Sequence, residues 1–155
     1  MSEAAETVPL ARLFAMAYGH LIDGLHARLA EQGWHDVRPA FGFILLAVRS
    51  GPITATEIAA LMGTTKQAAS KLVTAMDEAG YVQHTVHPGD SRAKLVGLTR
   101  RGQRLLAAVD QIYRDLEAEW AKTLGATRIE HLRADLTTVL RATHQGQLPP
   151  VRPTP

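Results

Sequence analysis

The sequence predicts a mainly α-helical fold with a small β-ribbon, in which a winged helix-turn-helix lies between long N- and C-terminal helices. Three observations within residues 51–99 support this prediction. A short helix opens with a capping box at Thr54 and Glu57. Gly63 ends that helix in a tight turn before a second helix. Two β-prone runs then flank the turn at residues 88–91, as in a hairpin.

Two helices are expected before this segment. Apolar residues follow a three-four spacing between residues 8 and 32, which is typical of a long amphipathic helix. They are Leu10, Leu13, Phe14, Ala17, Leu21, Leu25 and Leu29. Residues 33–36 interrupt the pattern, and Pro39 suits the first turn of a second helix that extends to about residue 50. Residues 1–7 are expected to form a loose tail.

The elements after Gly63 follow from the same kind of pattern. The helix at residues 65–79 has one apolar face and one small, polar, basic face, and strands are expected at 81–86 and 93–98. Thr99 is a suitable N-cap for a long helix that reaches residue 124, and a last helix covers 127–143. The proline-rich residues 146–155 are expected to form a flexible tail.

The first and last helices carry more apolar surface than a central unit of about 50 residues can cover. We therefore expect residues 1–50 to hold an N-terminal dimerisation helix with a supporting helix, and residues 100–145 to form long C-terminal dimerisation helices. Residues 51–99 form the lobe between them. These apolar faces then bury each other across the two-fold axis of a homodimer. The alternative is a monomer whose long helices wrap one core.

Charge and composition narrow the class of protein. Residues 64–104 carry seven Lys/Arg and three Asp/Glu, a net charge of +4, although the whole chain carries only +2. A concentration of positive charge on the winged segment favours a nucleic-acid partner. The chain has no cysteine, which excludes disulfides and thiolate chemistry. With neither a membrane-length apolar run nor a signal peptide, we expect a cytoplasmic protein without membrane contact.

The second helix of the helix-turn-helix carries the side chains expected to meet DNA. In its first two turns these are Lys66, Gln67, Ala68, Ser70 and Lys71. Such positions reach base edges when a helix enters the major groove by its N-terminus. Lysine donates to guanine, glutamine bonds adenine with two hydrogen bonds, and a small alanine lets the backbone approach. Thr64 or Thr65 is expected to cap the helix and leave its free amides near a phosphate.

Other roles remain open for these side chains. Gln67 lies three residues after Thr64 and is a second candidate for a capping box. Lys66 and Lys71 are also suited to contact phosphate alone, which adds affinity and salt dependence without sequence choice. Ser70 suits either base contact or solvation.

The hairpin carries a charged tip. Arg92 lies near this tip, where a guanidinium is suited to a narrow, negative minor groove. Asp90 is expected to shape the turn and hold Arg92, and Lys94 is expected to lie closer to the DNA backbone. The alternative is an ordinary exposed charge pair of little energetic value.

The residues MGTTKQAASKLVTAMDEAGYV (62–82) and HPGDSRAKLVGLTRRG (87–102) resemble the MarR family of bacterial transcription regulators. The D-x-R wing followed by L-T and a long helix is fairly specific to that family. The resemblance implies a triangular homodimer that binds a pseudo-palindromic DNA operator, usually as a repressor. It also implies a small aromatic or phenolic effector, held between the dimerisation helices and the DNA-binding lobe. The chain lacks the N-terminal cysteine with which some members sense peroxide.

An effector pocket is expected where the first, second and fifth helices converge. The aromatic or polar candidates near these elements are Tyr18, His20, Trp34, Phe41 and Tyr113. A packing role in the core is the alternative for each of them. His84 and His87 are close in sequence, but their odd spacing on a strand directs them to opposite faces. We therefore expect no metal site.

Two other functions are compatible with a winged helix. A ligand-independent architectural DNA binder would share the helix and the wing but show weak sequence preference. A winged helix used for protein contact would present an apolar or acidic face, which the positive charge of residues 64–104 disfavours. We expect neither an enzyme nor a cofactor, because the chain contains no glycine-rich phosphate loop and no recognisable nucleophile–base pair.

Overall fold

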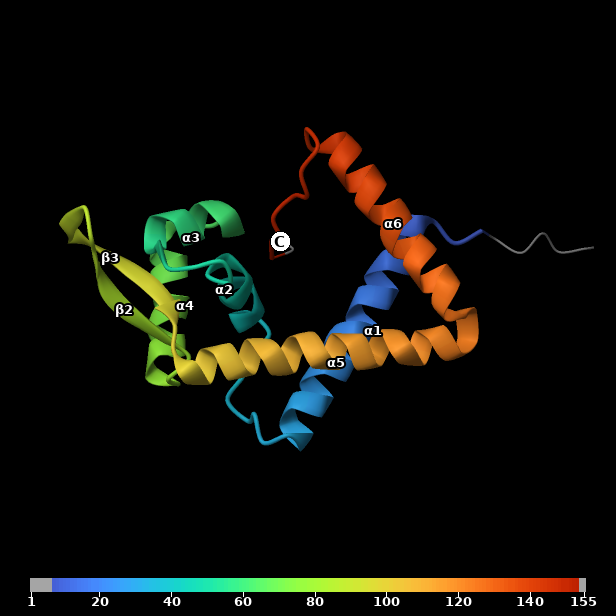
Figure 1. Cartoon of the computed structure of the whole chain (residues 1–155), viewed down its shortest axis with the longest axis horizontal. Coiled ribbons are helices and arrows are strands. Elements are labelled where there is room, and N and C mark those ends of the chain that lie inside the picture. Colours follow the sequence, from blue (N-terminus) through green and yellow to red (C-terminus); the bar gives the residue numbers. More distant parts are fainter. Residues whose placement is uncertain (1–6, 154–155) are drawn as a thin grey trace, which may run out of the picture.

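The structure is a computed structural model that describes residues 7–153, which form six helices and a small antiparallel sheet at one end of the molecule (Figure 1). Except for Thr7, the expected N-terminal loose tail lies outside the described residues, as do the last two residues of the expected C-terminal tail. The elements are α1 (Leu10–Glu31), α2 (Phe41–Ala47), β1 (Ile53–Thr54), α3 (Ala55–Met62), α4 (Lys66–Glu78), β2 (Val82–His87), β3 (Asp90–Leu98), α5 (Arg100–Leu124) and α6 (Ala126–Thr143).

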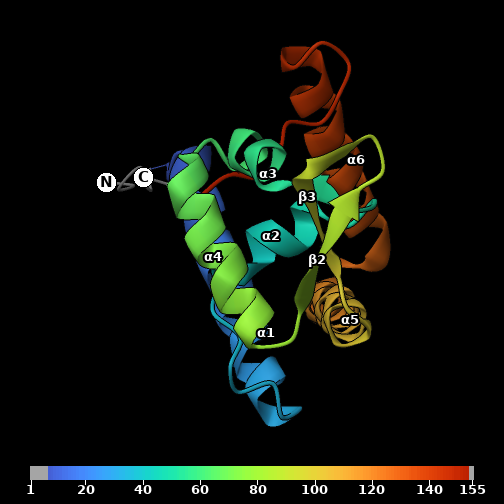
Figure 2. The same ribbon diagram turned by 90° about the vertical axis from the view of Figure 1, so that its left-hand side faces the viewer.

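Residues 36–99 pack into one unit, which we call the lobe. In it α2 contacts both α3 and α4, and α4 contacts β2. Figure 2 looks along α5 and shows α2 between α4 and the sheet. The core of the lobe is apolar. Its largest buried side chains come from α2, α3, α4, the connection after α4 and the sheet: Phe41, Ile44, Leu45, Ile58, Val73, Met76, Tyr81, Val82 and Val96. The expected supporting helix, α2, is therefore part of the lobe's own core.

Local capping signals set the ends of the lobe helices. The Thr54 hydroxyl accepts from the Glu57 amide, and the Glu57 carboxylate accepts from the Thr54 amide, so the expected capping box is present. This exchange also holds the pKa of Glu57 below its usual value. Gly63 closes α3 in the left-handed conformation, with φ of 65°, which glycine adopts without steric cost.

The sheet has three strands, in the order β1–β3–β2, where the sequence predicted only a hairpin. β1 is two residues long and pairs with the inner end of β3, Ile53 opposite Val96. β3 begins at Asp90, three residues earlier than expected, and a bulge lies between Val86 and His87. The ribbon projects from the lobe, with its tip farthest from α5 (Figure 1).

The long helix α5 runs out of the lobe and forms an arm with α1 and α6, both of which pack against it (Figure 1). Leu116 of α5 lies close to Gly24 of α1, which has no side chain to keep the two helices apart. Ion pairs support both contacts: Arg28 of α1 with Glu119, and Arg133 of α6 with Glu117.

Apolar side chains remain exposed on both outer helices of the arm. Leu10 is 68% exposed in α1, and Val139 is 60% exposed in α6. Others of the same kind are Leu13, Phe14, Met16, Leu132 and Leu140. An exposed apolar set of this extent is typical of an interaction surface.

Gly102 is the tightest position at the junction of lobe and arm. A Cβ atom there would lie 2.0 Å from the backbone oxygen of Tyr81. Because this neighbour is a backbone atom, no side-chain rotation can relieve the clash. We predict that Gly102→Ala lowers the free energy of unfolding by about 3 kcal/mol, as measured by urea titration. Gly19→Ala is the control, because nothing lies within 4 Å of its Cβ position in α1. Because alanine has a higher helix propensity than glycine, Gly19→Ala should raise the free energy of unfolding by about 0.5–1 kcal/mol. Equal effects of the two changes would contradict the packing argument.

Candidate nucleic-acid interface and ligand cavity

The N-terminus of α4 is open and positively charged. Thr65 is its N-cap, and the Thr65 hydroxyl accepts from the Ala68 amide at 3.1 Å. The third helical residue is therefore Ala68 and not Gln67, so Gln67 is not the partner of a capping box. Thr64 is half-buried in the preceding turn. The remaining free amides and the helix dipole make this end of α4 suited to an anion.

The residues predicted to face DNA share one accessible side of α4. Lys66, Gln67, Ala68 and Lys71 are exposed, and Ser70 is half-buried. The opposite side holds Ala69, Val73 and Met76 at 1% exposure or less, which fixes the rotation of the helix about its axis. The side chains that remain outside are small, polar or basic.

The tip of the ribbon has a defined shape. The Asp90 carboxylate accepts from the Arg92 amide at 3.0 Å and from Arg92 Nε at 3.4 Å. Across the turn, Nδ1 of His87 accepts from the Gly89 amide. The Arg92 side chain is nevertheless 92% exposed. Lys94, two residues further along β3, is also exposed. Asp90 thus orders the backbone while the guanidinium remains available to a partner.

A buried tyrosine connects α4 and the wing to the rest of the chain. Tyr81, between α4 and β2, is fully buried, and its hydroxyl donates to the Asp36 carboxylate. Arg101 of α5 donates to both the Asp36 carboxylate and the Tyr81 oxygen, and its guanidinium lies 4.8 Å from the Tyr81 ring centre. The hydrogen bond from Tyr81 lowers the pKa of Asp36, whereas burial raises the pKa of Tyr81.

A cavity of about 330 Å³ lies between α1, α2 and α5, where the sequence placed the pocket of an effector. Its walls are mostly apolar, with Leu25, Phe43 and Val109 among them. Polar groups converge on it from several elements: Tyr18, His26, Arg38, Arg49, Asp110 and Tyr113. Burial, together with Tyr18 and Asp110, raises the pKa of Tyr113, so this phenol keeps its proton. Size and lining fit a small organic ligand.

Only two of the five residues predicted for this pocket line it, Tyr18 and Tyr113. Phe41 is 1% exposed and packs edge-on against Tyr81 in the lobe core. Trp34 lies beneath the Arg101 guanidinium, and His20 stacks on Trp120 between α1 and α5. The rings of Phe41, Trp34 and His20 therefore pack between elements of the protein and do not line the predicted ligand pocket.

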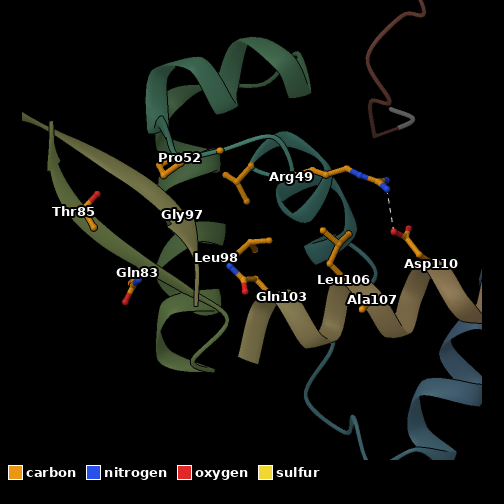
Figure 3. Close-up of a pocket in the computed structure, with 12 residues that line it drawn as sticks. Arg49, Pro52, Gln83, Thr85, Gly97, Leu98, Gln103, Leu106, Ala107 and Asp110 are labelled. Carbon is orange, nitrogen blue, oxygen red and sulfur yellow. Dashed lines mark hydrogen bonds and ion pairs between the residues drawn. The ribbon is translucent and has the colours of Figure 1, made fainter. Parts of the chain in front are cut away.

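A charged pair that was not predicted from the sequence separates the cavity from a second one. Arg49 donates to the Asp110 carboxylate at 3.1 Å, and both residues, with Leu106, also line a groove of about 470 Å³ between α5 and the sheet (Figure 3). No local pattern marks this contact, because the partners lie 61 residues apart. Arg38 and Arg49 supply guanidinium groups to the lining of the cavity between α1, α2 and α5.

Neither a metal-binding cluster nor a membrane-spanning helix is found in residues 7–153. These residues contain no group of three or more side chains arranged to hold a metal, and His84 instead lies 3.6 Å from the Asp77 carboxylate. None of the helices described is long and apolar enough to cross a bilayer.

Comparison with known proteins identifies the fold. The model of the MarR family matches residues 36–93, which span α2 to the wing. The crystal structure of the reduced form of MarR from E. coli is 28% identical, covers 87% of this chain and 98% of its own, and superposes with a TM-score of 0.72. Residues 36–93 thus match the MarR family, and the chain resembles solved structures of that family over most of its length. The transcriptional regulator Tm0710 from Thermotoga maritima, 23% identical over 90% of this chain and 99% of its own, has the same fold at a TM-score of 0.69. No curated protein sequence matches the chain.

In this fold, α3 and α4 form the helix-turn-helix and β2–β3 form the wing. The chain thus has the winged-helix fold seen in structures of MarR-family transcription regulators. The structural likeness extends beyond the matched segment to most of the chain, including the arm.

The contact between Asp36 and Tyr81 predicts a pH-dependent loss of stability. A carboxylate whose pKa is lower in the folded chain adds stability above its unfolded pKa of about 3.9, and this stability is lost as the pH falls through the folded pKa. We predict that Asp36→Asn costs about 1 kcal/mol at pH 7, because solvent screens a side chain that is 46% exposed. The cost should shrink below about pH 4.

Urea unfolding at pH 3 to 7 measures this difference. Asp135→Asn, at an exposed position of α6, is the control and should change little at any pH. A cost for Asp36→Asn that stays constant over the whole range would contradict a role for the Asp36 charge.

Proposed function

We propose that this chain is a homodimeric, sequence-specific DNA-binding transcription regulator, a repressor released by a small-molecule effector. The observation that carries the proposal is the exposed, basic N-terminal face of α4 beside a wing whose Arg92 is 92% exposed. Both occur in a chain with the MarR-family fold. One of the similar structures is itself described as the multiple antibiotic resistance repressor, MarR, at 26% identity, and this supports the choice of repression.

For DNA contact, we assign base reading to Lys66, Gln67, Ala68 and Ser70, which lie in the part of α4 that enters a major groove first. The amides beyond Thr64 and Thr65, with Lys71 and Lys94, are suited to phosphates. Arg92 is suited to the minor groove, because Asp90 orders its backbone and leaves the guanidinium free. An adenine or guanine preference then comes from Gln67 or Lys66.

For the dimer, we propose that the exposed apolar faces of α1 and α6 are covered by the same faces of a second copy. These faces lie on the arm, away from the wing (Figure 1). A two-fold pairing buries them and sets two copies of α4 on one side of a DNA duplex, about 34 Å apart. In this proposal residues 51–99 supply the DNA contacts of the lobe, and α2 supports its core. The dimerisation helices are α1, within residues 1–50, and the two helices of residues 100–145.

For the effector, we propose a small aromatic or phenolic compound in the cavity between α1, α2 and α5. Apolar walls suit a ring, the protonated phenol of Tyr113 supplies a hydrogen-bond donor, and Arg38 or Arg49 pairs with an anionic group. The cavity lies between arm and lobe, so a ligand there acts on the angle between them.

Selection of bound sequences from a random duplex library tests the function. At near-physiological salt we predict enrichment of an inverted repeat whose half-sites lie about one helical turn apart, because a two-fold dimer presents two copies of α4. Sedimentation of the protein alone should give a dimer. Retained DNA without a motif would favour an architectural binder instead, and no retention at all would favour a protein-contact module.

The role of the wing is tested by the salt dependence of binding. A phosphate contact contributes about 0.9 to the slope of log K against log salt concentration. We predict that Arg92→Ala weakens operator binding and flattens this slope by about one unit. Arg141→Ala removes the same charge from the exposed surface of α6 and should leave the slope unchanged. An unchanged slope for Arg92→Ala would remove the wing from the proposed interface.

A further inference from the structure

The chain reverses direction after α6 and returns to the lobe. Gln145 and Gly146 both have positive φ, and the Gly146 amide donates to the Arg141 oxygen at 2.8 Å, which closes the end of α6. Residues 147–153 then run back without regular structure from the arm to the neighbourhood of α2 and α3 (Figures 1 and 2). Pro149 and Pro150 hold the backbone of this segment extended.

Arg152 attaches the segment to the helix-turn-helix. Its Nε donates to the Leu61 oxygen at 3.3 Å, and its Nη2 donates to the Ala60 oxygen at 3.4 Å. These carbonyls belong to the last turn of α3, at the negative end of the helix dipole, and the Ala60 oxygen also accepts from the Gly63 amide. The guanidinium also lies across Gly63, with Nε 3.2 Å from the position of a Cβ atom. A side chain at position 63 would therefore require the Arg152 side chain to shift by a few tenths of an ångström.

The neighbouring residue of the segment reaches the ligand cavity. Val151 is one of the residues that line the cavity between α1, α2 and α5. It is 56% exposed, so it stands at the mouth of the cavity and is not fixed in the core. Two consecutive residues thus contact two proposed functional regions, the effector cavity and the turn that precedes α4.

We propose that residues 147–153 are a strap that couples the two regions, in competition with a ligand. A ligand that fills the cavity displaces Val151, and this displacement withdraws Arg152 from the end of α3. The two hydrogen bonds of Arg152 are exposed, so a small ligand is sufficient to break them. Release of the strap removes one of the connections that hold the lobe against the arm. The effector half of this inference rests on the proposed function.

The test compares the full-length chain with Arg152→Ala. The ligand probe is 1-anilinonaphthalene-8-sulfonate, an aromatic anion whose fluorescence reports binding. A chain whose strap is released has a larger fraction of open cavities, so the variant should bind the probe at least about threefold more tightly. Arg152→Lys keeps a donor and should remain close to the full-length chain, and Arg141→Ala should match it. A chain that lacks residues 147–155 should behave as Arg152→Ala does, and one that lacks only residues 154–155 should not.

Hydrogen exchange supplies a readout that needs no ligand. The amides of Gly63 and Thr64 donate to the last turn of α3, and their exchange should accelerate in Arg152→Ala and in the full-length chain with bound probe. Equal probe affinity in all variants, including no binding by any, would overturn the strap, as would unchanged exchange at these amides. Loss of DNA binding with these differences intact would instead refute the proposed function and leave the strap standing.

Discussion

The position of α4 depends on the side chain of Tyr81. This residue ends the connection from α4 to β2, and its ring is buried against Phe41 of α2 and Trp34 of the segment after α1. Its hydroxyl would be costly to bury without a partner, and the Asp36 carboxylate removes that cost. Its backbone oxygen accepts from the Thr99 amide at the start of α5. One residue therefore fixes four segments relative to each other.

Two further residues at the start of α5 strengthen the same junction. Arg101 adds a positive charge beside Asp36 and covers the rings of Tyr81 and Trp34, so the first turn of α5 is held by both charge and aromatic surface. Thr99 caps that turn, and its hydroxyl also donates to the Gly80 oxygen. The wing leaves the junction on one side and the arm on the other. The position of the wing and α4 relative to the arm is thus set at one place.

The sequence was sufficient for features that depend on neighbouring residues. Thr54, Gly63 and Thr99 end or begin helices through contacts within a few residues, and all three act as their positions predicted. Strand β1 was missed because two residues are too few for an alternating pattern, and its pairing depends on β3, some 40 residues away. The pair Arg49–Asp110 and the cluster around Tyr81 were missed for the same reason. Phe41 and Trp34 were assigned to a ligand because an apolar face does not indicate which neighbour will cover it.

The length of α5 has a mechanical consequence. The helix is continuous from the lobe to the far end of the arm, and its buried residues Leu105, Ile112 and Leu116 make it one rigid rod. At 1.5 Å per residue, such a rod is about 37 Å long, so a tilt of only about 5° at one end moves the other end by about 3 Å. That displacement approaches the rise of one base pair along B-DNA. Rotations too small to disturb any single packing contact therefore suffice to bring a DNA-reading surface out of register with the grooves.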